Sequence, residues 1–129
     1  MKKISLLTLL FFIGFFLFSQ DTLTVLHYNL LNYGNYTDYC TSENNNISIK
    51  DQYIKTIVDY VRPDIFTVNE ISSSLAIQQR MLDNNLNIDG IDYYKKANFI
   101  KVADSYIVNA LYYNSQKLIL KFHSIAQSY

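Results

Sequence analysis

Two polar residues, Asn29 and Glu70, stand where apolar, β-rich segments end, and both are of types that bind a hard metal ion. Asn29 follows the run Thr22–Tyr28, and Glu70 follows the run Asp64–Asn69. A carboxylate and an amide oxygen make a partial all-oxygen shell, which suits Mg²⁺ or Mn²⁺ better than zinc. The sequence therefore predicts a divalent-metal site wherever the fold brings these two residues together.

Each of the two residues also has an ordinary structural interpretation. Asn29 alone fits a turn residue at a strand end, and Glu70 alone fits a solvated carboxylate in front of a helix. Cys40 is the only cysteine, so we expect a free thiol or a partner outside this sequence. Cys40, His27 and His123 match no zinc-ligand spacing, and we expect both histidines to have packing roles.

The segments that position Asn29 and Glu70 have the pattern of a βαβ unit. Strand, loop, helix and strand are predicted in turn over Thr22–Leu30, Leu31–Asn46, Ile47–Arg62 and Asp64–Ile71. The only proline, Pro63, ends the helix. The two strands of such a unit run parallel, and their carboxyl ends share one edge of the sheet. We therefore expect Asn29 and Glu70 on the same rim.

The second half of the chain predicts one more helix and three short strands. These are expected, in order, over Ser73–Leu86, Tyr93–Ala97, Ile107–Asn114 and Lys117–Ser124. The last two strands flank a turn and predict a hairpin. Such a narrow sheet leaves a face or an edge uncovered, so residues 20–129 are interpreted as the first part of a larger α/β domain.

The amino-terminal residues have the pattern of a secretory signal peptide. Lys2 and Lys3 precede the apolar run Ile4–Phe18, which is shorter than the ~20 residues that span a bilayer. Residues 1–19 are predicted to be removed, which places the protein in the periplasm or outside the cell. The alternative is an uncleaved anchor, the one membrane contact that the sequence implies.

The charge of the remaining chain bears on its substrates. Loss of the leader leaves 9 Lys+Arg against 11 Asp+Glu, a net charge of about −2. No basic stripe is present, so bulk attraction to nucleic acid is not the signature of this sequence. A phosphate ester as substrate would need a metal ion to supply positive charge.

Two motifs together resemble the opening of the endonuclease/exonuclease/phosphatase superfamily, which has the DNase I-like fold. Leu26-His27-Tyr28-Asn29 is similar to the family's first strand, and the segment Pro63–Glu70 is similar to its Pro-Asp-(apolar run)-(Gln/Asn)-Glu strand. Ala110–Asn114 with Lys117-Leu118 resembles a later segment of the family. The resemblance spans about Thr22–Ser124, with Asn69 where the family more often has Gln.

The resemblance implies an α+β sandwich of the DNase I-like type and a Mg²⁺- or Mn²⁺-dependent phosphodiesterase. Glu70 would hold the metal, and Asn29 would help hold it or orient the phosphate. The family's catalytic His, its Asp-x-Asn motif and its terminal Asp-His pair have no match here. A secreted endonuclease acting on nucleic-acid phosphodiester bonds, nearly inactive in this portion alone, is therefore expected.

Two alternatives stay open at this point. One is a phosphoesterase of the same fold that acts on phospholipid head groups or small molecules. The other is a non-catalytic secreted binding module whose Tyr- and Asn-rich loop, Asn32–Asn46, makes the contacts. No stable protein partner is implied by the sequence.

Overall fold

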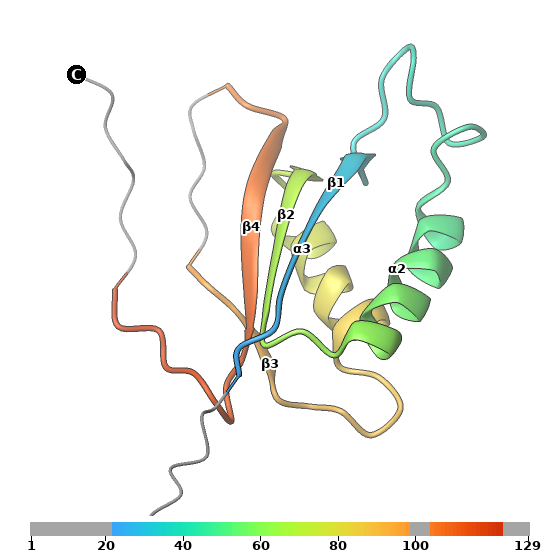
Figure 1. Cartoon of the computed structure of the whole chain (residues 1–129). Helices are drawn as coiled ribbons and strands as arrows, with labels where there is room; N and C mark the ends of the chain where they lie inside the picture. Colours follow the sequence, from blue (N-terminus) through green and yellow to red (C-terminus); the bar gives the residue numbers. More distant parts are fainter. Residues whose placement is uncertain (1–21, 99–103, 123–129) are drawn as a thin grey trace, which may run out of the picture.

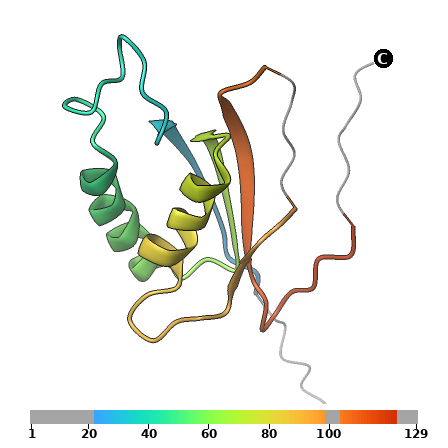
Figure 2. The same ribbon diagram turned by 180° about the vertical axis from the view of Figure 1, so that it is seen from behind.

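The structure, a computed structural model, describes residues 22–98 and 104–122 and combines one mixed sheet with helices on one of its faces. Figures 1 and 2 show the sheet from its open side and from its helical side. The elements are β1 Val25–Tyr33, α2 Ile47–Val61, β2 Ile65–Ser72, α3 Leu75–Met81, the π-helical turn η1 Leu82–Leu86, β3 Tyr94–Lys96 and β4 Ile107–Asn114. The strand order is β1-β2-β4-β3. The α/β class is thus confirmed.

The predicted βαβ unit is confirmed. β1 and β2 pair in parallel, in a register that runs from Val25 opposite Ile65 to Asn29 opposite Asn69. The Asn46 side chain caps α2 by accepting hydrogen bonds from the backbone N–H groups of Ser48 and Ile49, and Arg62 ends the helix in the left-handed conformation.

The predicted carboxyl-terminal hairpin is wrong for the described residues. β4 pairs antiparallel with β2 along one edge and with β3 along the other, which leaves no free edge for a returning strand. After Asn114 the chain closes a turn instead, with the amides of Lys117 and Leu118 bonded to the Asn114 carbonyl. Residues 117–122 form no strand, and His123 lies outside the described residues.

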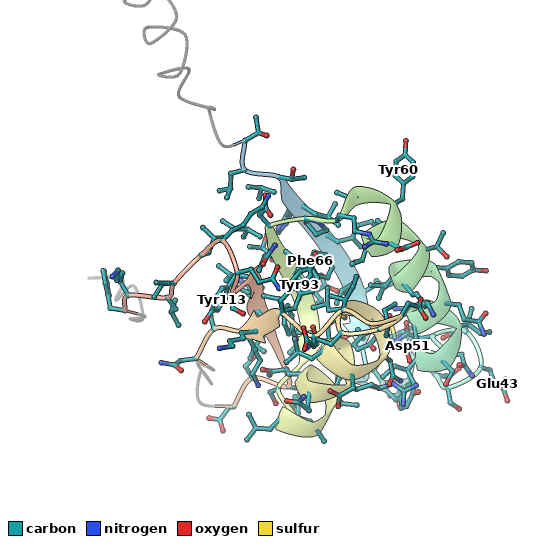
Figure 3. The ribbon with its side chains drawn as sticks, turned by 90° about the horizontal axis from the view of Figure 1, so that it is seen from below. Glu43, Asp51, Tyr60, Phe66, Tyr93 and Tyr113 are labelled. Atoms are coloured by element: carbon teal, nitrogen blue, oxygen red, sulfur yellow. The ribbon has the colours of Figure 1, made fainter. Side chains whose placement is uncertain are left out.

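The core lies between the sheet and the helices, on one face only. Its largest fully buried members come from β1, β2, α3, η1 and β4 and include Tyr33, Phe66, Ile71, Met81, Leu86 and Tyr112. Figure 3 shows Phe66 inside this layer, whereas Tyr60 projects from α2 into solvent. No helix among the described residues is long and apolar enough to cross a membrane. The predicted signal peptide, residues 1–19, lies outside the described residues.

Among the described residues β1 is an edge strand, with β2 as its one neighbour. Val25 is 59% exposed and Tyr28 43% exposed. Leu26 packs against the core, so Val25 and His27 lie on the opposite, uncovered face of the sheet. β-branched and aromatic residues favour a strand but do not distinguish an edge from a centre.

The Asp of the Pro-Asp motif, Asp64, has a structural role. It lies at the start of β2, at the opposite end of the strand from Glu70. Its buried carboxylate accepts a hydrogen bond of 3.1 Å from the Thr24 amide and pairs with Lys117 at 2.9 Å. The Thr24 amide, and then Lys117, lower the pKa of Asp64 despite its burial. These contacts fix the start of β1 against β2 and thereby set the register that aligns Asn29 with Asn69.

Candidate functional site

Asn29 and Glu70 meet at the carboxyl-terminal rim of the sheet, as the βαβ topology predicts. Asn29 Nδ2 donates a hydrogen bond to Glu70 Oε1 at 3.0 Å. Asn29 Oδ1 accepts one from the Leu31 amide at 2.9 Å. The two contacts together define the orientation of the side-chain amide, since one end must donate and the other accept. Asn29 is therefore held by its own strand end and in turn holds one oxygen of Glu70.

The backbone is irregular at both residues. The register of β1 against β2 shifts after Asn29, and that of β2 against β4 shifts between Val68 and Ile71. Glu70 has a φ of 58°, a conformation that residues with side chains rarely adopt. Bulges of this kind re-aim side chains and are common beside active sites. The strand end thus departs from regular geometry where the candidate ligand stands.

Lys50 on α2 adds a positive charge to this rim. Its Nζ donates to the carbonyls of Leu30 and Leu31, each at 2.7 Å. Burial lowers the pKa of Lys50, while the charge of Glu70 works in the opposite direction. Lys50 was not predicted as part of the site. The sequence places Lys50 in the first turn of a helix, where the macrodipole disfavours a cation, but this position does not identify the groups that Lys50 contacts.

His27 lies two residues before Asn29 on the uncovered face, and its expected packing role is wrong. The ring is exposed and makes a hydrogen bond of 2.8 Å between Nδ1 and Thr67 Oγ1 on β2. Alternate residues of a strand share a face, so His27 and Asn29 point to the same side of the sheet. Packing was expected because His27 lies inside the predicted first strand.

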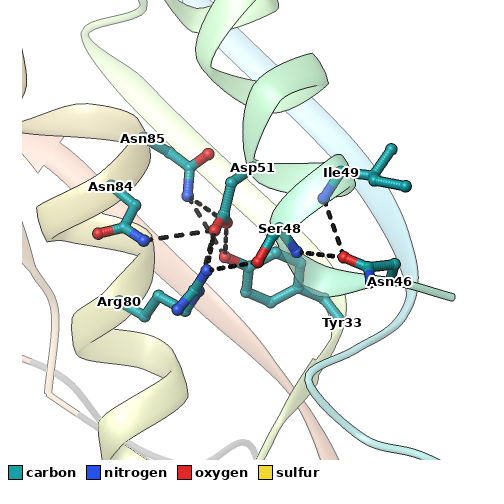
Figure 4. A network of polar contacts seen from close by, with 8 residues as sticks. All are labelled: Tyr33, Asn46, Ser48, Ile49, Asp51, Arg80, Asn84 and Asn85. Atoms are coloured by element: carbon teal, nitrogen blue, oxygen red, sulfur yellow. Dashed lines mark hydrogen bonds and ion pairs between the residues drawn. The ribbon is translucent and has the colours of Figure 1, made fainter. Parts of the chain in front are cut away.

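A buried polar network supports the site from the helical side (Figure 4). Asp51 of α2 accepts hydrogen bonds from Tyr33 at the end of β1, from Arg80 Nε at 2.9 Å and from Asn85 Nδ2 at 3.0 Å. Asn84 donates to the same carboxylate at 3.3 Å. The network joins β1, α2, α3 and η1, and so fixes the strand that carries Asn29.

Protonation in this network is shifted by burial and by the hydrogen bonds. Burial would raise the pKa of Asp51, but the donors Tyr33, Asn85 and Arg80 outweigh it and lower that pKa. Burial and the neighbouring Asp51 raise the pKa of Tyr33. The carboxylate is therefore held ionised and the phenol neutral. All these contacts are internal, which is typical of a structural element and not of an open site.

The Asn-rich loop is held together largely by its own asparagines. Asn45 donates to the Asn32 carbonyl at 3.0 Å and Asn44 to the Tyr39 carbonyl at 2.9 Å. Cys40 is a free, half-buried thiol whose Sγ accepts from Asn32 Nδ2 at 3.5 Å. Two tyrosine side chains of the loop face solvent, Tyr36 at 49% and Tyr39 at 89% exposed, whereas Tyr33 is fully buried.

The residues present fit part of a metal shell. Glu70 offers a carboxylate, and proteins commonly bind Mg²⁺ through only one or two carboxylates. Asn29 turns Nδ2 toward Glu70 and Oδ1 toward the Leu31 amide, so its side chain orients that carboxylate. Within residues 22–98 and 104–122, no group of three or more His, Cys, Asp and Glu side chains gathers around a common point. In comparison with known proteins, no family model, curated protein or solved structure matches this chain.

Proposed function

We propose that this chain carries part of the active site of a secreted, divalent-metal-dependent phosphodiesterase of the DNase I-like type. The observation that supports the proposal is the hydrogen bond between Asn29 Nδ2 and Glu70 Oε1. It joins two hard oxygen-bearing residues at the carboxyl ends of neighbouring parallel strands, where open α/β sheets bind ligands. Nucleic acid is the proposed substrate, and phospholipid head groups or small phosphate esters are the alternatives within the same class.

The two residues have different parts in the proposed site. Asn29 donates to Oε1 of Glu70, so the other carboxylate oxygen, Oε2, would be the one that holds the ion. A bound Mg²⁺ or Mn²⁺ supplies the charge that polarises a phosphoryl oxygen. Lys50 adds a cation on the same side, which favours an anionic substrate in a protein whose net charge after loss of the leader is about −2. Asn29 is therefore a positioning residue first.

Metal binding by Glu70→Gln tests the proposal directly. Gln keeps the size of the side chain but removes the charge, so we expect Mn²⁺ affinity to fall about tenfold or more, as measured by electron paramagnetic resonance. Glu43→Gln is the matched control, because Glu43 is the only other glutamate and lies exposed in the loop. We expect Glu43→Gln to bind Mn²⁺ as the wild type does.

Hydrolysis gives a second readout. We expect little or no turnover of plasmid DNA or of a chromogenic phosphodiester with Mg²⁺, because no residue present matches the family's general acid and base. Equal Mn²⁺ binding by the wild type and Glu70→Gln would overturn the proposed site. Strong Mg²⁺-dependent turnover that Glu70→Gln abolishes would instead show that the site is more complete than proposed.

A second candidate function is a binding module, and the exposure of Tyr39 favours it. Tyrosine offers a large amphipathic contact surface at low entropic cost, and this ring is 89% exposed. In this case, Tyr39→Ser would abolish binding of a surface ligand, whereas Glu70→Gln would leave that binding unchanged.

A further inference from the structure

A cavity of about 230 Å³ opens between β1 and α2, directly beside the Asn29–Glu70 contact. Its lining combines apolar and aromatic side chains with a polar, charged end. Tyrosine and aliphatic side chains line most of the cavity, and Lys50 brings an ammonium group to the rim next to Asn29. The lining residues that matter here are Tyr28, Leu31, Tyr53, Ile57, Asn29 and Lys50.

The two tyrosines are available to a ligand. Tyr28 is 43% exposed and Tyr53 is 66% exposed, although both line the cavity. Tyrosine rings of this kind stack planar groups, and stacking tolerates any base because every base has a π-face. The aromatic part of the cavity is therefore suited to a flat ring that keeps one edge in water.

The polar end of the cavity is complementary to an anion. Lys50 Nζ uses two of its three donors on the Leu30 and Leu31 carbonyls, which leaves one donor for a ligand. The carbonyl contacts also fix the ammonium group close to Asn29. A ligand that combines a planar ring with a negatively charged group matches both ends of the cavity.

The size of the cavity limits the choice further. Pockets for drug-sized molecules measure roughly 300–1,000 Å³, so about 230 Å³ accommodates a single ring system and not a whole lipid. An acyl chain would also gain nothing from the cation at the rim.

We propose that this cavity binds a nucleobase of the nucleotide whose phosphate lies at the Asn29–Glu70 rim. The inference rests on the proposed function, since it names the part of the substrate that lies next to the phosphate. It assigns Tyr53 and Tyr28 to base stacking and Lys50 to the phosphate or sugar edge. It also favours nucleic acid over phospholipid among the substrate classes.

Adenosine 5′-monophosphate, titrated into the ¹⁵N-labelled protein in the presence of EDTA, tests the cavity without any metal. We expect amide shifts centred on Leu30, Leu31 and Tyr53. Ribose 5-phosphate, which lacks the base, should bind about fivefold or more weakly. Equal affinity for the two compounds, or shifts outside the cavity, would overturn the inference.

Two variants on one helix provide the matched comparison. Tyr53→Ala should weaken adenosine 5′-monophosphate binding by about fivefold or more. Tyr60→Ala should not, because Tyr60 lies on the same helix, is 90% exposed and does not line the cavity. Unchanged nucleotide binding by Tyr53→Ala, with its fold intact by circular dichroism, would also overturn the inference.

The two proposals fail separately. If Mn²⁺ binding depends on Glu70 but the nucleotide does not bind in the cavity, the base site is wrong and the metal site stands. If the nucleotide binds but Glu70→Gln leaves Mn²⁺ binding unchanged, the proposed function is wrong and the cavity is a nucleotide site of another kind. Binding of dihexanoyl phosphatidylcholine in place of the nucleotide would contradict the choice of ligand.

Discussion

Glu70 has a strained backbone, and the residues around it hold it there. Its φ of 58° costs about 1 kcal/mol or more for a residue with a side chain. The next residue, Ile71, is fully buried and pairs with both Tyr33 and Val108. Ile71 therefore fixes the backbone after Glu70, and the positive φ of Glu70 is the conformation that allows this pairing. Backbone strain at a proposed metal ligand such as Glu70 favours a functional role for that residue.

The meeting of Asn29 and Glu70 was predictable, whereas the other residues of the site were not. Parallel strands share an edge, so two residues at strand ends are brought together by topology alone. Lys50 contacts carbonyls 19 and 20 residues away, and His27 contacts Thr67 across the sheet. Such contacts depend on how a helix or a neighbouring strand is placed, and no spacing in the sequence encodes that placement.

Asp51→Asn should lower the free energy of unfolding and make it less dependent on pH in the acid range. The pKa of Asp51 is lowered in the folded state, so its ionised form stabilises the protein above the unfolded pKa of about 4. This stabilisation is lost as the pH falls through the lower folded pKa. We expect the variant to lose about 1–3 kcal/mol at pH 7 in urea unfolding, with a smaller loss at pH 3.

Asp59→Asn serves as the control on the same helix. Asp59 pairs with Arg62 at the surface, and both side chains are more than half exposed. Exposed pairs contribute about 0–1 kcal/mol, so this variant should stay close to the wild type at both pH values. An equal effect of the two substitutions would mean that the buried network does not stabilise the fold.

Elements with strong local signals were predicted almost residue for residue. α2 was expected over Ile47–Arg62 and occupies Ile47–Val61, because Asn46 and Pro63 mark its ends. The predicted hairpin was wrong because β-propensity does not determine which strand pairs with which. β3 occupies the edge of β4 that the returning strand would have used.

Asn46→Ala tests the cap of α2. The Asn46 side chain accepts from the Ser48 amide at 2.9 Å and from the Ile49 amide at 3.2 Å. Loss of these bonds should lower the free energy of unfolding by about 1 kcal/mol, measured by urea titration. Asn46→Asp keeps the acceptor and should retain the stability of the wild type. A loss of equal size in both variants would assign the effect to something other than capping.

At the scale of the molecule, the sheet formed by the described residues has helices on one face and no described element on the other. Val25, Ile65 and Tyr113 stand opposite one another across three strands on the open side. β1 also presents a free edge among the described residues. Open apolar faces and unpaired edges promote contacts between chains. We therefore expect this face and this edge to promote self-association of the protein.

Val25→Lys should reduce self-association without loss of fold. Val25 is 59% exposed, so the substitution should change stability by about 0.5 kcal/mol or less. We expect the wild type to show a rising sedimentation coefficient with concentration and the variant to show a flatter curve. Ile119→Lys removes a comparable apolar group outside the sheet, at a residue 76% exposed, and should not flatten the curve. A wild type that is monomeric at every concentration would contradict the prediction.

The π-helical turn η1 has a consequence for how this sequence can change in evolution. Its defining bond runs from the Asn87 amide to the Leu82 carbonyl, five residues apart, so the turn holds one residue more than an α-helical turn. Deletion of that residue would rewind the helix and rotate the following side chains by about 100°. Asn84 and Asn85 could then no longer both reach Asp51. Among homologues, the length of this segment and the identity of residue 51 should therefore change together.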